Sequence, residues 1–214
     1  MIDLNKQFNS FKSIICLNGE IPTKYFFDRY ASLPIIAADG AANSLIKMRI
    51  NPTIIVGDLD SIDTQLIPAY IEVLHVHDQN HNDLEKCLDV INERKLFPCL
   101  IFGATGKETD HTLYNLNVIE KYSMHNQIMF HDSAYKDKEK YGIFVSDHLH
   151  GNLKMGSKIS LLSSSESVVT TKGLTWELNN MVLSPGISST RNLINDTKLE
   201  IVVHKGNVLV LFDF

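Results

Sequence analysis

The chain has 214 residues, of which 44% are hydrophobic and 21% are charged, and its formal net charge at pH 7 is −5. These proportions are typical of a globular protein and exclude a mainly disordered or low-complexity chain. No apolar run approaches the roughly 18 residues of a membrane span, and no basic run offers a surface for nucleic acid. We expect one large or two small domains, with neither a membrane nor nucleic acid as a partner.

The first six residues lack the basic region and apolar core of a secretory signal. The three cysteines, Cys16, Cys87 and Cys99, form no Cys-x-x-Cys pair, and each lies in an apolar segment. Such positions favour buried, reduced thiols. We therefore expect a cytoplasmic protein.

Residues 1–133 alternate short β-rich runs with segments of helical periodicity. The runs are nearly continuously apolar, which is typical of strands buried on both faces of a parallel sheet. We expect strands within residues 13–18, 35–39, 53–58, 73–76, 99–103 and 128–132.

Helical spacing of apolar residues follows two aspartates. After Asp83 the apolar positions are Leu84, Cys87, Leu88 and Ile91, and after Asp110 they are Leu113, Leu116 and Ile119. The alternation of strands and helices predicts an α/β domain over residues 1–133, with a mostly parallel, Rossmann-like sheet and flanking helices.

From residue 141 onward, short strand-like runs replace the helical patterns. Turn signals separate these runs at 141–142, 155–157, 163–165, 185–186 and 205–207. This pattern predicts a small antiparallel β-sandwich domain over residues 141–214. A domain of this size is marginally stable alone, so we expect it to pack against the first domain, a partner subunit, or both.

Four polar segments follow predicted strands or open the next helix, at residues 38–43, 57–61, 80–83 and 103–111. In a parallel sheet these positions share the carboxyl edge, where open α/β folds bind ligands. We therefore expect five carboxylates to converge although they are far apart in the chain: Asp39, Asp58, Asp60, Asp83 and Asp110.

Converging carboxylates repel one another unless a cation neutralises them. Oxygen donors without a Cys/His cluster favour Mg²⁺, which usually completes its shell with water and substrate phosphates. Gly40 and Gly57 allow a close backbone approach, and helix N-termini offer N–H groups to phosphate. The pattern indicates metal-assisted phosphoryl chemistry on a nucleotide, without a P-loop or a Gly-x-Gly-x-x-Gly motif.

Each element also has a structural interpretation when it is taken alone. Asp83 or Asp110 could cap a helix, and Asp39 with Gly40 could form a turn. Trp176, the only tryptophan, would by itself be assigned to the core.

In this order and spacing, the segments resemble thiamine pyrophosphokinases. The most specific element is the run Gly57-Asp58-Leu59-Asp60-Ser61-Ile62, followed about 50 residues later by Asp110-His111. Gly173-Leu174-Thr175-Trp176 matches a tryptophan strand of the family, and Ser189-Thr190-Arg191-Asn192 stands where a Ser-Asn pair is expected.

The resemblance implies transfer of the β,γ-pyrophosphoryl group of ATP to thiamine, giving thiamine diphosphate and AMP. It implies that Asp58, Asp60 and Asp83 hold Mg²⁺ and, with Asp110, form the catalytic set. It also implies a homodimer with the active site at the subunit interface, where Trp176 of the partner subunit covers the cationic thiazolium. The residues implied to bind ATP or thiamine are Asp39, Gly40, Asn43, Ser61, Asn82, Lys107, His111, Trp176, Ser189 and Asn192.

The sequence departs from the family pattern at several positions. Asn80 and Asn82 stand where Asp and Thr are usual, Glu108 stands where Arg is expected, and Arg191 interrupts the Ser-Asn pair. Lys107 could supply the missing cation, as a point charge rather than a fork. Two alternatives remain open: a Mg²⁺-dependent phosphohydrolase or nucleotidyl transferase on another small molecule, and a non-catalytic nucleotide- or thiamine-binding module.

Overall fold

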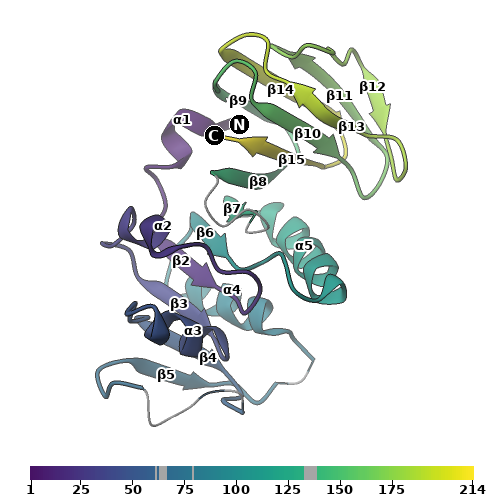
Figure 1. Ribbon diagram of the computed structural model, residues 1–214. Coiled ribbons are helices and arrows are strands. Elements are labelled where there is room, and N and C mark those ends of the chain that lie inside the picture. The colour runs from purple at the N-terminus through teal and green to yellow at the C-terminus, as the bar shows by residue number, and fades with distance from the viewer. Residues whose placement is uncertain (61, 63–66, 79, 133–138) are drawn as a thin grey trace. The chain divides into compact units, whose positions relative to one another are not determined.

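The computed structural model describes residues 1–60, 62, 67–78, 80–132 and 139–214. Within these ranges the fold is mixed α/β with two sheets (Figure 1). The chain divides into two compact units. We call them the α/β unit (Phe11–Ile119 and Asn126–Asp137) and the β unit (Met1–Ser10, Glu120–His125 and Lys138–Phe214).

The α/β unit contains the six strands that the sequence predicts. They are β2 (Ser13–Cys16), β3 (Ile35–Ala38), β4 (Ile54–Gly57), β5 (Glu72–His75), β6 (Cys99–Phe102) and β7 (Ile128–His131). Their order is β7-β6-β2-β3-β4-β5, and every pairing among them is parallel. The order reverses between β2 and β6, which is where open α/β sheets bind ligands.

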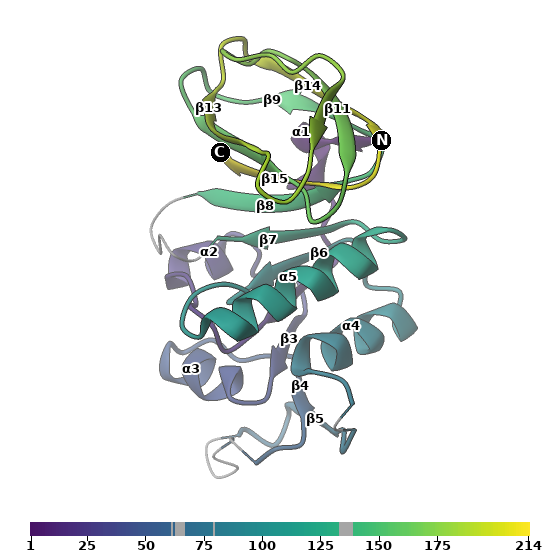
Figure 2. The same cartoon turned by 90° about the vertical axis from the view of Figure 1, so that its right-hand side faces the viewer.

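Helices cover the parallel strands on both faces. They are α2 (Lys24–Asp28), α3 (Ala41–Lys47), α4 (Asp83–Glu93) and α5 (Thr109–Ser123). Right-handed crossovers from strands that progress in opposite directions place α2 and α3 on one face and α4 and α5 on the other. Figure 2 shows α4 and α5 together in front of the sheet.

The apolar positions of the two predicted helices differ in how far they are buried. In α4 the four apolar positions after Asp83 are all buried. In α5, Ile119 is buried, but Leu113 is 58% exposed. Val118 joins Ile119 on the buried face, so the buried side of this helix is narrower than its apolar spacing alone indicates.

The expectation of burial on both faces is also wrong for β5. Five of the six strands are fully buried, whereas Val73 in β5 is 38% exposed. β5 stands at the end of the strand order and pairs with β4 alone. An edge strand has one neighbour fewer to cover its side chains, which accounts for the exposure.

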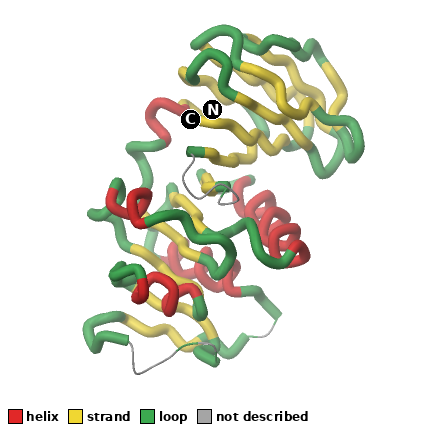
Figure 3. Tube along the Cα trace, in the orientation of Figure 1, coloured by secondary structure: helices red, strands yellow, loops and turns green. Residues whose placement is uncertain are grey.

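The β unit contains the remaining strands and α1 (Leu4–Gln7). One sheet has the order β1 (Ile2–Asp3), β9 (His148–Asn152), β14 (Lys198–Lys205), β11 (Ser167–Lys172) and β12 (Met181–Leu183). The other four strands run in the order β13 (Ser189–Leu193), β10 (Lys158–Leu162), β15 (Val208–Asp213) and β8 (Lys140–Val145). Figure 3 shows these strands in yellow, joined by green turns.

Most of the predicted turn signals of the β unit separate its strands. Residues 155–157, 163–165 and 185–186 lie between strands, and Gly206 follows β14. Tyr141 and Gly142 instead lie within β8, so that prediction of a turn is wrong. Among the described residues, the strands of this unit pair antiparallel, except that β1 pairs in parallel with β9.

The prediction of a mostly parallel sheet needs a correction. Of the ten strands assigned to the larger sheet, six are the parallel strands of the α/β unit and four are antiparallel strands of the β unit. This sheet is therefore mixed.

The three cysteines are free and buried, as expected from their apolar surroundings. Burial raises the pKa of the Cys16, Cys87 and Cys99 thiols above the ordinary value. Among the described residues, no helix combines the length and the apolar character that crossing a bilayer requires.

Candidate functional site

A cavity of about 500 Å³ lies at the carboxyl ends of the parallel strands in the α/β unit. Its walls come from the loops that follow β2, β3, β4 and β6 and from the first turns of α4 and α5. The strand order reverses between β2 and β6, so the cavity occupies the position expected of a ligand site in such a sheet. Its volume is in the range of small-molecule sites.

Three carboxylates gather beside this cavity. Asp39 follows β3 and is buried, Asp58 follows β4 and is half-buried, and Asp60 is exposed. Each offers one oxygen, and these oxygens lie within 4.8 Å of one another. The arrangement follows from two adjacent parallel strands ending side by side, as the sequence predicts for these residues.

Gly57 permits this approach. A Cβ atom at residue 57 would lie 2.7 Å from the Cβ of Asp39, closer than two such carbons can come. The glycine is therefore required by Asp39, the buried member of the carboxylate group.

The loop after β4 favours the ionised form of Asp58. The backbone N–H of Asp60 donates to Asp58 Oδ1 at 3.4 Å, and this contact lowers the pKa of Asp58. Desolvation opposes the effect, while the positive charge of Lys86 acts in the same direction. A carboxylate that stays ionised is what a cation site requires.

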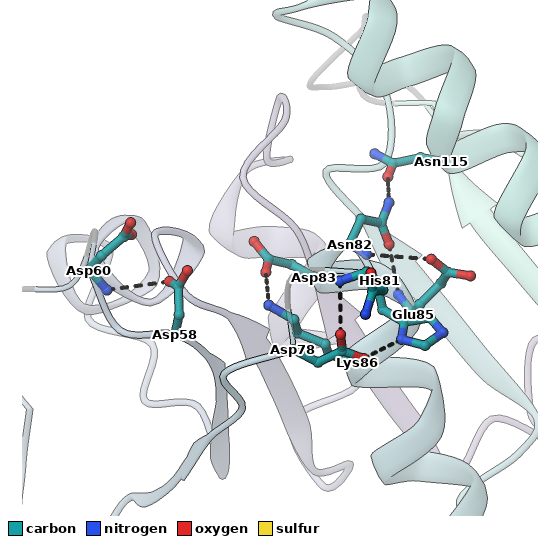
Figure 4. Close-up of polar contacts among 10 residues, drawn as sticks. Asp58, Asp60, Asp78, His81, Asn82, Asp83, Glu85, Lys86 and Asn115 are labelled. Atoms are coloured by element: carbon teal, nitrogen blue, oxygen red, sulfur yellow. Dashed lines mark hydrogen bonds and ion pairs between the residues drawn. The ribbon is translucent and has the colours of Figure 1, made fainter.

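The first turn of α4 brings another carboxylate to the cavity. Asn82 is the N-cap residue: its Oδ1 accepts the N–H of Glu85 at 2.9 Å, and the Glu85 side chain accepts the N–H of Asn82. The interpretation of Asp83 as the cap is therefore wrong, and Asp83 lines the cavity. In Figure 4, Asp58 and Asp60 lie at the left of the view, and Asp83 lies between them and Glu85, in contact with Lys86.

Lys86 is a charged residue of the site that the sequence analysis missed. It is only 7% exposed, and its Nζ lies 3.5 Å from Asp83 Oδ1 while the residue lines the cavity. Lysine is almost never buried to this degree unless it is paired. Helical spacing does not single out Lys86, because the residues on every side of the first turns of α4, from Leu84 to Leu88, are buried.

Asp78 and His81 are also residues of the cavity wall that the sequence analysis did not select. His81 Nδ1 lies 2.5 Å from Asp78 Oδ2. The hydrogen bond to Asp78 raises the pKa of His81, and the same contact lowers the pKa of Asp78. Their separation of three residues just before a helix is the sequence signal for such a pair.

The same cavity is lined by several of the residues that the family resemblance implies. They are Asp39, Gly40, Asn82, Lys107 and His111, and Glu108, which stands where arginine is expected, lines the cavity as well. Lys107 Nζ is bonded within the loops, donating to the backbone oxygen of Asn18 at 2.6 Å and to its Oδ1 at 3.1 Å.

Other expected residues lie elsewhere. Asp110 is not among the described residues of the cavity wall; it borders a smaller space of about 270 Å³, and its Oδ1 accepts the N–H of His111 at 2.8 Å. Asn43 is in α3 and is likewise not a described wall residue. Ser61 lies outside the described residues.

Trp176, Ser189 and Asn192 belong to the β unit. Trp176 is 61% exposed, so the assignment of this tryptophan to the core is wrong. Asn192 is 2% exposed and is hydrogen-bonded to the backbone of Trp176.

Comparison with known proteins gives matches over both units. The family model described as "Thiamin pyrophosphokinase, catalytic domain" matches residues 30–131. The model described as "Thiamin pyrophosphokinase, vitamin B1 binding domain" matches residues 146–208. The first match contains the carboxylate group, and the second contains Trp176.

Similar individual proteins carry the same name. Thiamine pyrophosphokinase 1 of Oryza sativa subsp. japonica is 27% identical over 222 residues, covering 88% of this chain and 82% of its own. The crystal structure of yeast thiamin pyrophosphokinase superposes with a TM-score of 0.82 at 16% identity, over 99% of this chain and 90% of that chain. The Bacillus subtilis thiamine pyrophosphokinase structure gives 0.77 at 24% identity, over 94% and 97%. These structures share the fold of this chain.

Proposed function

The chain belongs to the thiamin pyrophosphokinase family, and on this basis we propose that it transfers a pyrophosphoryl group from ATP to thiamine. The hydroxyl oxygen of thiamine forms a bond to the β-phosphorus, the bond between that phosphorus and the α,β-bridging oxygen breaks, and AMP leaves. The hydroxyl proton passes to a nearby carboxylate or to water. The observation that carries the proposal is the carboxylate group beside the cavity, within the match to the catalytic domain.

The donor set at the carboxyl edge suits Mg²⁺. Asp39, Asp58 and Asp60 offer oxygen atoms close enough to share one ion, with no histidine or cysteine in the group. We propose that these residues would hold the ion, with Asp83 of the cavity wall as a further carboxylate donor. When bound, Mg²⁺ supplies positive charge that offsets the charge of the triphosphate.

The remaining work of the protein is to position the triphosphate and neutralise its charge. Lys86 and Lys107 line the cavity and bring positive charge to it. The N–H groups in the first turn of α4 face an anion favourably, because a helix N-terminus carries partial positive charge. With Glu108 where the family has arginine, we assign to Lys86 the role of the missing cation.

We propose that thiamine is held by the β unit. The exposed indole of Trp176 offers a flat face to the cationic thiazolium. From the family resemblance we propose a homodimer in which Trp176 of the partner subunit covers the thiamine. The nucleotide then occupies the cavity where the strand order reverses, as in a Rossmann-like sheet, and the sandwich of the β unit presents the tryptophan. Free, buried thiols are consistent with a cytoplasmic reaction.

The direct test is to incubate the purified protein with ATP, Mg²⁺ and thiamine and to quantify thiamine diphosphate and AMP together. We expect equimolar amounts of both products and neither without Mg²⁺. Thiamine monophosphate with ADP would show attack on the wrong phosphorus. Phosphate release without thiamine would favour a phosphohydrolase, and binding of both ligands without turnover would favour a non-catalytic module.

A further inference from the structure

Trp176 combines high exposure with a firmly held backbone. It lies in the segment 173–178 between β11 and β12 and is the only tryptophan of the chain. A large aromatic side chain with 61% exposure contributes little to the core. The backbone on both sides of it is nevertheless held by hydrogen bonds to the side chains of Asn192, Glu177 and Thr171.

Asn192 holds the Trp176 peptide units from one side. Its Oδ1 accepts the N–H of Trp176 at 3.1 Å and the N–H of Leu193 at 2.9 Å. Its Nδ2 donates to the carbonyl oxygen of Trp176 at 2.7 Å and to Ser189 Oγ at 3.2 Å. Two donor and two acceptor contacts use the full capacity of an asparagine side chain.

This saturation changes the role expected of Asn192. The residue is 2% exposed, and its four contacts leave no polar group for a ligand. The asparagine of the expected Ser-Asn pair therefore binds the backbone of Trp176. A buried amide with all its partners is also a rigid element, because breaking any contact leaves an unsatisfied polar group.

Glu177 holds the same segment from the other side. Its Oε1 accepts the N–H groups of Gly173 at 2.7 Å and Leu174 at 3.0 Å, and its Oε2 accepts the hydroxyl of Thr171 at 2.7 Å. The Thr171 hydroxyl oxygen accepts the N–H of Leu178 at 2.9 Å. Both flanks of Trp176 are thus bonded to side chains of neighbouring residues.

We infer that Asn192 is a positioning residue for thiamine binding, which fixes the backbone of Trp176 so that its indole is held ready to stack on the cationic ring. The inference rests on the proposed function for the identity of the ligand. An aromatic platform that is rigid before binding loses less conformational entropy when the ligand arrives. Asn192 therefore acts on thiamine affinity through Trp176 and not by touching the ligand.

The test uses Asn192→Ala, Asn192→Asp and a control, Asn152→Ala. Asn152 is an exposed residue of the same unit, in β9. Asn192→Asp retains the shape and the acceptor for the two N–H groups, but it places a carboxylate oxygen against the carbonyl oxygen of Trp176, so that contact becomes repulsive. For each variant we would measure the KM for thiamine, the KM for ATP, kcat, and the fluorescence anisotropy of the single tryptophan.

For Asn192→Ala we expect an about tenfold higher KM for thiamine, an unchanged KM for ATP, and a lower tryptophan anisotropy at equal lifetime. Asn192→Asp should raise the KM for thiamine and lower the anisotropy at least as much as Asn192→Ala, and Asn152→Ala should match wild type. In a Trp176→Ala background, Asn192→Ala should cause no further rise in the KM for thiamine. An equal rise in both backgrounds would overturn the inference, because Asn192 would then act on the ligand itself.

Unchanged anisotropy in both Asn192 variants would also overturn the inference. Because anisotropy is read without substrate, this result is independent of turnover. Failure of the proposed function is seen separately, as a wild-type protein that makes no thiamine diphosphate. An unchanged KM for thiamine in Trp176→Ala would overturn the ligand part of the inference, whatever the anisotropy shows.

Discussion

Gly57 and Asp39 lie so close that a methyl group on residue 57 would come within 2.7 Å of the Asp39 Cβ. The position of the buried carboxylate therefore depends on the absence of a side chain on the neighbouring strand. We expect Gly57→Ala to displace Asp39 and to lower kcat/KM by about a hundredfold, because small displacements of positioned groups have effects of that size. The free energy of unfolding should fall by about 1–3 kcal/mol, as for other overpacked sites.

The double variant Asp39→Gly/Gly57→Ala checks the cause of this loss. With the Cβ of residue 39 removed, adding a methyl group at residue 57 should no longer reduce the urea midpoint. A persistent loss of stability in the Asp39→Gly background would place the clash elsewhere.

Asp58→Asn or Asp60→Asn should lower kcat by at least about a hundredfold while the urea midpoint stays near that of wild type. Removing one of several like charges relieves repulsion, so the fold does not depend on these carboxylates. Asp28→Asn is a matched control, since Asp28 is an exposed aspartate of the same unit that pairs with Lys24 in α2. A large loss of stability with activity retained would show that Asp58 and Asp60 are structural.

Lys86→Met keeps the length of the side chain and removes its charge. We expect an about tenfold or greater rise in the KM for ATP, because a charge-assisted contact to phosphate is lost. The urea midpoint should not fall, since a buried charge costs desolvation that methionine avoids. Lys47→Met, an exposed lysine at the end of α3, is the control. Equal ATP affinity in Lys86→Met and wild type would contradict the role that we assign to this lysine.

The ion pair between Glu72 and Arg94 joins β5 to the end of α4, and its contribution to stability depends on pH. Both guanidinium nitrogens of Arg94 donate to the carboxylate, at 2.9 and 2.6 Å, and this contact lowers the pKa of Glu72. A lowered pKa in the folded state adds stability above the ordinary pKa of glutamate, and this stability is lost as the pH falls through the folded value. Glu72→Gln should therefore have a lower urea midpoint than wild type at pH 7, and the difference should shrink on acidification. A difference that stays constant down to pH 3 would assign the effect to packing.

The sequence predicts the strands of the α/β unit and the meeting of Asp39, Asp58 and Asp60, because both depend on short-range patterns. Continuous apolar runs define the strands, and parallel strands end at a common edge. Lys86 was missed because its burial depends on neighbouring elements rather than on its own residue type. The capping of α4 by Asn82 instead of Asp83 is decided by a bond to the backbone of Glu85, which spacing alone cannot assign.

The β unit shows the same limit more strongly. The residue type of Trp176 indicates a core residue. The hydrogen bonds between Asn192 and the Trp176 backbone show instead that the backbone of an exposed tryptophan is held in place. The exposure of Leu113 and of β5 likewise depends on which neighbours cover them. Tertiary contacts determine the exposure of these residues, and the pattern of a single sequence does not predict those contacts.

Because the buried thiols and the single tryptophan lie in different units, the unfolding of each unit can be followed by a separate measurement. Cys16, Cys87 and Cys99 all lie in the α/β unit, while Trp176 lies in the β unit. A thiol reagent labels the first unit only when it opens, because burial keeps these sulfurs protonated and covered. Labelling rate and tryptophan emission, followed through one denaturant series, would therefore separate concerted opening of the chain from sequential opening without any introduced dye.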